Sequence, residues 1–224
     1  MLRRKRASSA ASRPWTMGVE FPSLNIRMHE VSKRFGRNWI IKQKSEEYVS
    51  GRIYGVRGRN GSGKSTLIRL LAGHLSPSRG NISYTLDDRT LPVDQLYRHL
   101  SWIGPYFEIV EELTVYEFLS FHFALKPLLP HLSVSEVVTR IGLEKASGYA
   151  LTDCSSGMRQ RVLLASALYA ATPLLLLDEP TVTLDADSAE WFQGELKIYT
   201  KDRLTLIASN DERDLIPCDT IDVL

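Results

Sequence analysis

A glycine-rich stretch at residues 58–66, GRNGSGKST, has the residue types that phosphate binding requires. It fits the pattern of a glycine, four further residues and then Gly-Lys-Ser. Glycines allow backbone conformations in which successive N–H groups converge on phosphate oxygens. We therefore expect this phosphate loop to bind a nucleotide, with an ordinary glycine-rich turn as the alternative. The loop consists of Gly58, Arg59, Asn60, Gly61, Ser62, Gly63, Lys64, Ser65 and Thr66.

Two side chains of the phosphate loop have expected roles in this chemistry. Lys64 should reach the β- and γ-phosphates, and the hydroxyl of Ser65 should bind Mg²⁺. A helix predicted from about Ser65 points its positive end at the same charge. Residues 52–56 before the loop are typical of a buried strand, and apolar residues recur on one helical face after it. The loop thus has the strand, loop and helix context that a phosphate site needs.

An entirely apolar run at residues 174–177 ends in two acids, Asp178 and Glu179. Such a run predicts a strand buried on both faces, as in a parallel sheet, and ligands bind at the carboxyl ends of these strands. We expect Asp178 to hold Mg²⁺ through water and Glu179 to act as general base toward the attacking water. A strand that simply ends in a polar turn is the alternative.

Two further stretches are candidates for ligand contact. Phe35 and Trp39 flank a Gly-Arg turn, where an aromatic ring could stack on a purine, unless both rings pack in the core. Ser155 and Ser156 stand at the start of an Ala- and Leu-rich helix predicted to extend to residue 171, and its free N–H groups would offer a second anion site. Helix capping alone would also explain both serines.

The remaining pattern predicts one α/β domain with two additions. Strands at 24–31, 39–48 and 81–84 should form a small antiparallel sheet beside the nucleotide, followed by a polar connection at 86–91. Residues 111–143 should form an inserted helical block, interrupted by Pro127 and Pro130. Other elements are predicted at 93–100 (helix), 101–103 (strand), 187–200 (helix), 204–209 (strand) and 220–223 (strand).

An aromatic stripe, Phe118, Phe121 and Phe123, recurs in the helical block. We expect it either to pack in the core or to form a groove for a helix of another protein.

The length of 224 residues and the formal net charge of +2 suit one large soluble α/β domain. Residues 1–22 form a basic tail that we expect to be disordered, with a membrane-surface contact and a misassigned start codon as alternatives. The rest of the chain is mildly acidic, which gives no electrostatic support for nucleic-acid binding. No apolar run is long enough to cross a bilayer. Cys154 and Cys218 provide no disulfide framework, so we expect a reducing cytosol.

Over roughly residues 24–224, the order of these motifs resembles that of the ATP-binding subunit of an ABC transporter. The phosphate loop resembles the Walker A motif, Asp178 the Walker B aspartate and Glu179 the catalytic glutamate. Phe35 looks like the aromatic residue that stacks on adenine. The resemblance implies ATP and Mg²⁺ as cofactors and ATP hydrolysis as the activity.

The stretch Ser155-Ser156-Gly157-Met158 is similar to the signature motif of that family, usually written LSGGQ. Ser155 and Gly157 hold the positions that contact a γ-phosphate across a dimer, and Asp185 falls on the D-loop aspartate. The resemblance therefore implies a head-to-tail dimer with a second ATPase subunit, identical or different. It also implies docking on a separate membrane permease through the helical block, which would place the chain peripherally on the cytoplasmic face of the inner membrane.

The implied architecture is a P-loop NTPase fold of the α/β class. It has a mostly parallel core sheet flanked by helices, a small antiparallel β subdomain and an inserted α-helical subdomain at about 105–165, all within a domain spanning 23–224. The short length and the SSGM form resemble bacterial exporter-type subunits, including the haem-exporter-like group. The rival interpretation is a regulatory module for a soluble partner, or a nucleotide-gated switch that scarcely hydrolyses ATP.

Three positions depart from the family pattern. Asn210 stands where a histidine normally touches the γ-phosphate, and an asparagine donates a hydrogen bond without carrying charge. The glutamine of the Q-loop is absent, since its expected place holds Pro105 or Tyr106. Ser156 adds bulk at the first signature glycine. We expect ATP binding to be intact and basal hydrolysis to be slow.

Overall fold

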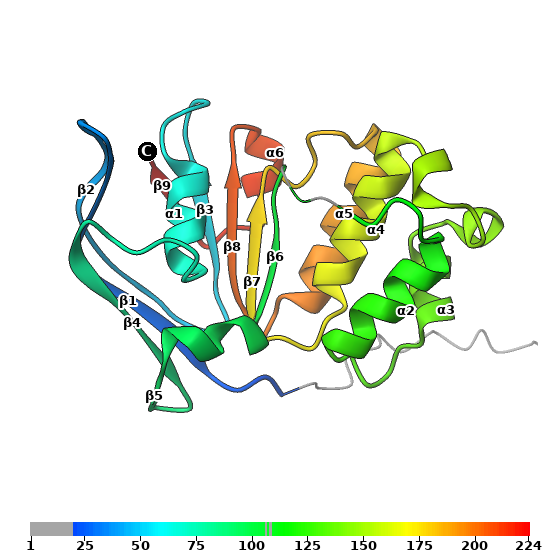
Figure 1. Ribbon diagram of the computed structural model, residues 1–224, viewed down its shortest axis with the longest axis horizontal. Coiled ribbons are helices and arrows are strands. Elements are labelled where there is room, and N and C mark those ends of the chain that lie inside the picture. The colour runs from blue at the N-terminus through cyan, green and yellow to red at the C-terminus, as the bar shows by residue number, and fades with distance from the viewer. Residues whose placement is uncertain (1–19, 106, 108) are drawn as a thin grey trace, which may run out of the picture.

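The computed structural model describes residues 20–224 apart from 106 and 108 (Figure 1). Most of the basic tail predicted at 1–22 lies outside these residues, so its disorder stays a prediction.

Five parallel strands form the central sheet, in the order β6-β7-β8-β3-β9. Every residue of the middle strands β7 and β8 is buried, as the apolar run at 174–177 predicts. Successive side chains of a strand point to opposite faces, so Leu174 and Leu176 join one hydrophobic cluster while Leu175 and Leu177 join another. The strands are β3 (Ile53–Arg57), β6 (Leu100–Ile103), β7 (Leu174–Asp178), β8 (Leu204–Ser209) and β9 (Thr220–Val223).

Each of these two clusters covers one face of the central sheet. On one face, α1 (Lys64–Leu71) packs together with an antiparallel sheet. On the other face lie α4 (Ser156–Leu168) and α5 (Ala186–Tyr199). Figure 1 shows the central strands between α1 and the antiparallel sheet on the left and α2 to α5 on the right. Because the five strands run parallel, the loops at their carboxyl ends lie at one edge of the sheet.

The antiparallel sheet has the strand order β2-β1-β4-β5. The polar connection predicted at 86–91 is wrong in part, because β5 pairs with β4 there through a hairpin. Asp87 and Asp88 both have positive φ, 48° and 61°, which a two-residue hairpin turn requires and which short polar side chains tolerate. The strands are β1 (Leu24–Phe35), β2 (Asn38–Tyr48), β4 (Arg79–Leu86) and β5 (Arg89–Leu91).

The helical block contains α2 (Val115–Leu125) and α3 (Val134–Arg140), with the two prolines between them. Both helices begin at a capping box, formed by Thr114 and Glu117 in α2 and by Ser133 and Glu136 in α3. The short helices elsewhere in the chain are η1 (Val93–Arg98), η2 (Glu144–Ala146), η3 (Leu151–Asp153) and α6 (Glu212–Leu215).

The aromatic stripe of α2 divides between core and surface. Phe123 is buried, Phe118 packs partly against the core, and Phe121 is 57% exposed. The stripe therefore does not act as a unit, and only its exposed part is free for a partner.

Candidate functional site

The carboxyl ends of three parallel strands meet at one site. The phosphate loop follows β3, the acids Asp178 and Glu179 close β7, and Ser209 and Asn210 close β8. A cavity of about 450 Å³ opens among them. Its lining combines residues of the phosphate loop with Phe35 from the antiparallel sheet and with Glu179 and Asn210. Segments far apart in the sequence thus form a single concave surface, the usual place for a ligand in this class of fold.

The phosphate loop owes its shape to glycines at positions that side chains cannot occupy. Gly61 and Gly63 have positive φ, 81° and 111°. A Cβ atom on Gly63 would also lie 2.7 Å from Cγ2 of Ile40, closer than real Cβ contacts. The loop therefore needs glycine at residue 63 for both conformation and space.

Lys64 begins α1 and is only 5% exposed. Its ammonium donates a hydrogen bond of 2.7 Å to the carbonyl of Gly58 and lies 3.0 Å from Oε1 of Glu179. The loop thus folds around its own lysine, and the ammonium is held beside the acid that follows β7.

Asp178 is buried, and its Oδ1 atom has no hydrogen-bond partner among the described residues. Burial raises the pKa of Asp178, and hydrogen bonding from the side chain of Ser65 opposes this effect. A buried carboxylate oxygen without a partner beside a serine hydroxyl is the oxygen-donor set that Mg²⁺ prefers. These residues therefore fit a magnesium ion, which Ser65 and Asp178 would hold.

Glu179 has a left-handed backbone conformation, with φ of 51°, that is uncommon for a residue with a side chain. Its amide donates a 2.7 Å hydrogen bond to the carbonyl of Ala208, so β8 holds this strained residue in place. Its Oε2 atom accepts from the amide of Asn210 at 3.3 Å and lies 3.2 Å from the hydroxyl of Ser209. The end of β8 therefore supports the expected general base directly.

Asn210 contacts the phosphate loop with its side chain. Its Nδ2 atom donates to Oδ1 of Asn60 at 3.3 Å. The side chain thus stands at the rim of the cavity with an uncharged donor.

The signature residues lie away from this cavity. Ser155 caps α4, and its hydroxyl accepts a hydrogen bond from the amide of Met158. Asp185 caps α5 by accepting from the amide of Ser188. Ser155, Gly157 and Asp185 do not line the 450 Å³ cavity among the residues described. Within the described chain Ser155 and Asp185 act as helix caps, and Gly157 lies in the first turn of α4.

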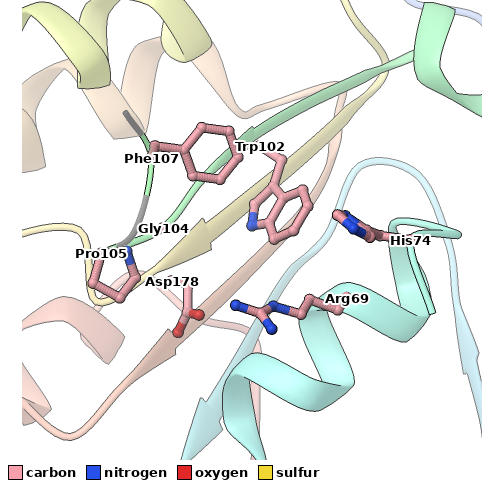
Figure 2. A pocket seen from close by; sticks show the side chains of 7 residues that line it. All are labelled: Arg69, His74, Trp102, Gly104, Pro105, Phe107 and Asp178. Carbon is pink, nitrogen blue, oxygen red and sulfur yellow. The ribbon is translucent and has the colours of Figure 1, made fainter. Parts of the chain in front are cut away.

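Pro105 stands at the expected place of the missing glutamine, while Tyr106 lies outside the described residues. Pro105 borders the 450 Å³ cavity and also a second cavity of about 360 Å³ next to Asp178 (Figure 2). Figure 2 shows Trp102 between Phe107 and His74, with Arg69 and Asp178 below them. The ring of Trp102 meets those of Phe107 and His74 edge to face, at centroid distances of 5.0 and 5.6 Å.

Sequence reasoning missed this aromatic group. It also missed Asp214, which accepts hydrogen bonds from Thr181 and from Ser209, the serine beside Glu179. Strand alternation could have placed Trp102 opposite the buried Ile103, but nothing local indicates which helix it meets.

In the part of the chain that the structure describes, no helix combines the length and the apolar character that a membrane crossing requires.

Comparisons with known proteins agree with this geometry. Residues 41–182 match the family model described as ABC transporter. The ATP-binding protein YtrE of Bacillus subtilis is 33% identical over 157 residues, covering 66% of this chain and 68% of that protein. The cytochrome c biogenesis ATP-binding export protein CcmA of Rhizobium etli is 32% identical over 180 residues, covering 79% of this chain and 83% of that protein.

The sulfate/thiosulfate import ATP-binding protein CysA of Anthoceros angustus is 32% identical over 207 residues, which cover 86% of this chain and about half, 52%, of that protein. Named exporters and importers thus both occur among the relatives.

Solved structures show the same fold. A putative ABC transporter ATP-binding protein from Pyrococcus furiosus superposes with a TM-score of 0.75 at 22% identity, covering 89% of this chain and 97% of that one. A dimeric ATP-binding cassette in a post-hydrolysis state, bound to ADP and Pi, gives 0.74 at 21% identity, covering 89% and 94%. The α/β P-loop NTPase architecture expected from the sequence is confirmed. The chain belongs to the ABC transporter family, as a homologue of its ATP-binding subunits.

Proposed function

We propose that this chain binds Mg·ATP and hydrolyses it as the energising subunit of a membrane transporter. The observation that carries the proposal is the single cavity that joins the phosphate loop to Glu179 and Phe35, with the buried Asp178 next to the lining residue Ser65. Lys64, Ser65 and Asp178 belong to one chain, so one chain is sufficient for ATP binding.

Binding begins with displacement of an internal ion pair. The triphosphate takes the ammonium of Lys64, which now lies 3.0 Å from Glu179. The amides of the loop and the start of α1 receive the remaining phosphate charge. The magnesium ion, when bound, neutralises charge on the β- and γ-phosphates. Phe35 is half exposed at the cavity edge, where its ring is free to stack on adenine.

Glu179 is the general base in this proposal. After Lys64 turns to the phosphates, one oxygen of Glu179 is free to accept a proton from water while the other stays bonded to the end of β8. The supports of this carboxylate are already in place without nucleotide, which is the preorganisation that catalysis needs. Asn210 supplies a neutral donor where a charged one would stabilise the transition state better, so we expect slow basal turnover.

The remaining parts of the site come from a second ATPase subunit, identical or different. Ser155, Gly157 and Asp185 lie at helix starts away from the cavity, which supports a head-to-tail arrangement in which they complete the partner's site. The pair docks on a separate permease at the cytoplasmic face of the membrane through the helical block, where Phe121 and Leu125 of α2 are exposed. We expect no nucleic-acid partner.

The test uses the whole purified chain and its Glu179→Gln variant. Mg·ATP should bind to the parent and should convert the variant from monomer to dimer, measured by light scattering after gel filtration. Glu190→Gln, which changes an exposed acid of α5, is the matched control and should not dimerise more than the parent. Absence of ATP binding contradicts the nucleotide site, and a variant that stays monomeric in saturating Mg·ATP contradicts the sandwich.

A second experiment tests the transporter role. The chain should be expressed in its native organism and extracted with a mild detergent. It should then co-purify with a polytopic membrane protein. Isolation with a soluble partner alone would favour the regulatory module instead.

A further inference from the structure

We propose that Asp214 is a positioning residue for Glu179, acting through the hydroxyls of Ser209 and Thr181. The proposal rests on the proposed function, because it takes Glu179 as the general base. None of the three residues belongs to the sequence motifs identified above.

Asp214 lies in the short helix α6 and is only 2% exposed. It has no cationic partner among its described contacts. Instead, its Oδ1 atom accepts a 2.8 Å hydrogen bond from Thr181, and its Oδ2 atom accepts a 2.7 Å hydrogen bond from Ser209. A buried carboxylate that is satisfied only by hydroxyls is costly to keep. Its place next to the site gives a reason for that cost.

The two hydroxyls belong to the two segments that determine where Glu179 lies. Thr181 follows Glu179 by two residues, in the turn after β7. Ser209 ends β8, and the next amide, that of Asn210, donates to Oε2 of Glu179. By accepting from both hydroxyls, one carboxylate ties the turn that carries the base to the strand end that supports it.

The hydroxyl of Ser209 has a single proton, which makes its orientation matter. It lies 2.7 Å from Asp214 and 3.2 Å from Oε2 of Glu179, and it accepts the amide of Asp211 at 3.0 Å. Because the contact with Asp214 is the shorter one, the hydroxyl of Ser209 donates its hydrogen bond to Asp214 and not to Glu179. Glu179 Oε2 then depends on the Asn210 amide, whose place is fixed by the anchored Ser209. Once a phosphate takes Lys64, this support is the main one left to the base.

We call the two hydrogen bonds that Asp214 accepts, from Thr181 and from Ser209, the clamp. Two variants weaken the clamp without removing side-chain volume. Asp214→Asn keeps the shape but has one acceptor oxygen for two hydroxyls, and Thr181→Val removes one hydroxyl. Thr181→Ser restores that hydroxyl. Glu212→Gln, at an exposed position of the same helix, is the control, since it changes only a surface ion pair with Arg57 and no contact of Asp214.

The first measurement is single-turnover hydrolysis of Mg·ATP by excess full-length chain, together with the Kd for ATP. We expect Asp214→Asn and Thr181→Val to slow hydrolysis by about tenfold or more and to change the Kd by less than about twofold, because small displacements of a catalytic group cost rate rather than binding. Thr181→Ser and Glu212→Gln should match the parent. Equal rates in the parent and in Asp214→Asn, or a loss of Kd in proportion to rate, would overturn the proposal.

The second measurement does not depend on hydrolysis. Amide hydrogen exchange of the segment 208–212, in nucleotide-free protein, should be faster in Asp214→Asn and Thr181→Val than in the parent, with Glu212→Gln unchanged. Unchanged exchange overturns the positioning role. If the parent hydrolyses no ATP while exchange responds as stated, the proposed activity fails and the clamp stands.

Discussion

The ammonium of Lys64 lies 3.0 Å from Oε1 of Glu179, and both side chains are largely buried, with 5% and 17% of their surface exposed. Without nucleotide, the expected phosphate ligand Lys64 and the expected general base Glu179 thus form an ion pair with each other. In the proposed function, ATP binding breaks this ion pair. Lys64 is then available to the phosphates and Glu179 to the attacking water.

Removing the acid should therefore tighten ATP binding. In Glu179→Gln the ammonium of Lys64 loses a charged partner and needs less work to reach phosphate. A net change of about 1 kcal/mol, the usual net contribution of one intramolecular hydrogen bond, gives roughly a fivefold lower Kd. Calorimetric titration with Mg·ATP measures it, with Glu190→Gln as control. A Kd equal to or above that of the parent would show that the ion pair does not compete with phosphate.

Phe35 should contribute to affinity through the base and not through the phosphates. Its ring is 50% exposed, with the ammonium of Lys33 5.2 Å from the ring centroid. Stacking of a base on an aromatic ring is worth about 1–3 kcal/mol, so Phe35→Ala should weaken ATP binding by roughly 5- to 150-fold.

Inorganic tripolyphosphate is the probe that isolates this effect. Its affinity should be the same in Phe35→Ala and in the parent, because it lacks a base. Phe121→Ala, which removes an exposed ring of α2, is the control for ATP. A parallel loss of tripolyphosphate binding would mean that Phe35 supports the loop and does not contact adenine.

The sequence was sufficient to locate the phosphate loop and β7, because each has a local signature. Glycine spacing identifies the loop, and an unbroken apolar run with acids at its end identifies the strand. The hairpin at Asp87 and Asp88 was missed, since a pair of aspartates does not by itself indicate positive φ.

Contacts between distant segments left no local signal. Thr181 and Asp214 are 33 residues apart, and only the packing of α6 against the end of β8 brings them together. Arg203 is fully buried, and it donates to the carbonyls of Ala167 and Leu168 at the end of α4. A sequence pattern would assign such an arginine to the surface. Composition and periodicity predict which face a residue takes, and they do not predict which buried polar group it meets.

Asp178 should lower the stability of the nucleotide-free protein at neutral pH. Burial raises its pKa, so the folded protein binds this proton more tightly than the unfolded chain does. Its contribution to the free energy of unfolding is therefore most favourable at low pH and falls as pH rises from the ordinary carboxyl pKa through the raised one. Above the raised pKa the ionised carboxylate costs stability, because a buried charge costs more than a buried amide.

Asp178→Asn should accordingly raise the Tm at pH 7, and this gain should shrink as the pH is lowered. The same variant should lose the Mg²⁺-dependent part of ATP affinity. Differential scanning fluorimetry across pH and ATP titrations with and without Mg²⁺ measure the two effects, with the exposed Asp202→Asn as control. A Tm that drops at pH 7 would show that the carboxylate is stabilised by contacts that outweigh its burial.

Asn210 offers the sharpest test of catalysis, because one substitution should increase activity. Its amide stands at the rim of the cavity, 3.3 Å from Asn60, and its own backbone N–H supports Glu179. Replacing the side chain by histidine keeps that backbone contact and adds a donor that can carry charge. A hydrogen-bond donor aimed at developing charge is commonly worth about 10²–10³ in kcat. A histidine that is only partly aligned should therefore raise kcat about tenfold or more in Asn210→His.

ATP affinity should change little, since the γ-phosphate gains the contact chiefly in the transition state. Asn210→Gln keeps an amide and should stay near the parent rate. Turnover of Asn210→His no faster than that of the parent would place the cause of slow hydrolysis elsewhere, with the missing glutamine near Pro105 as the next position to restore.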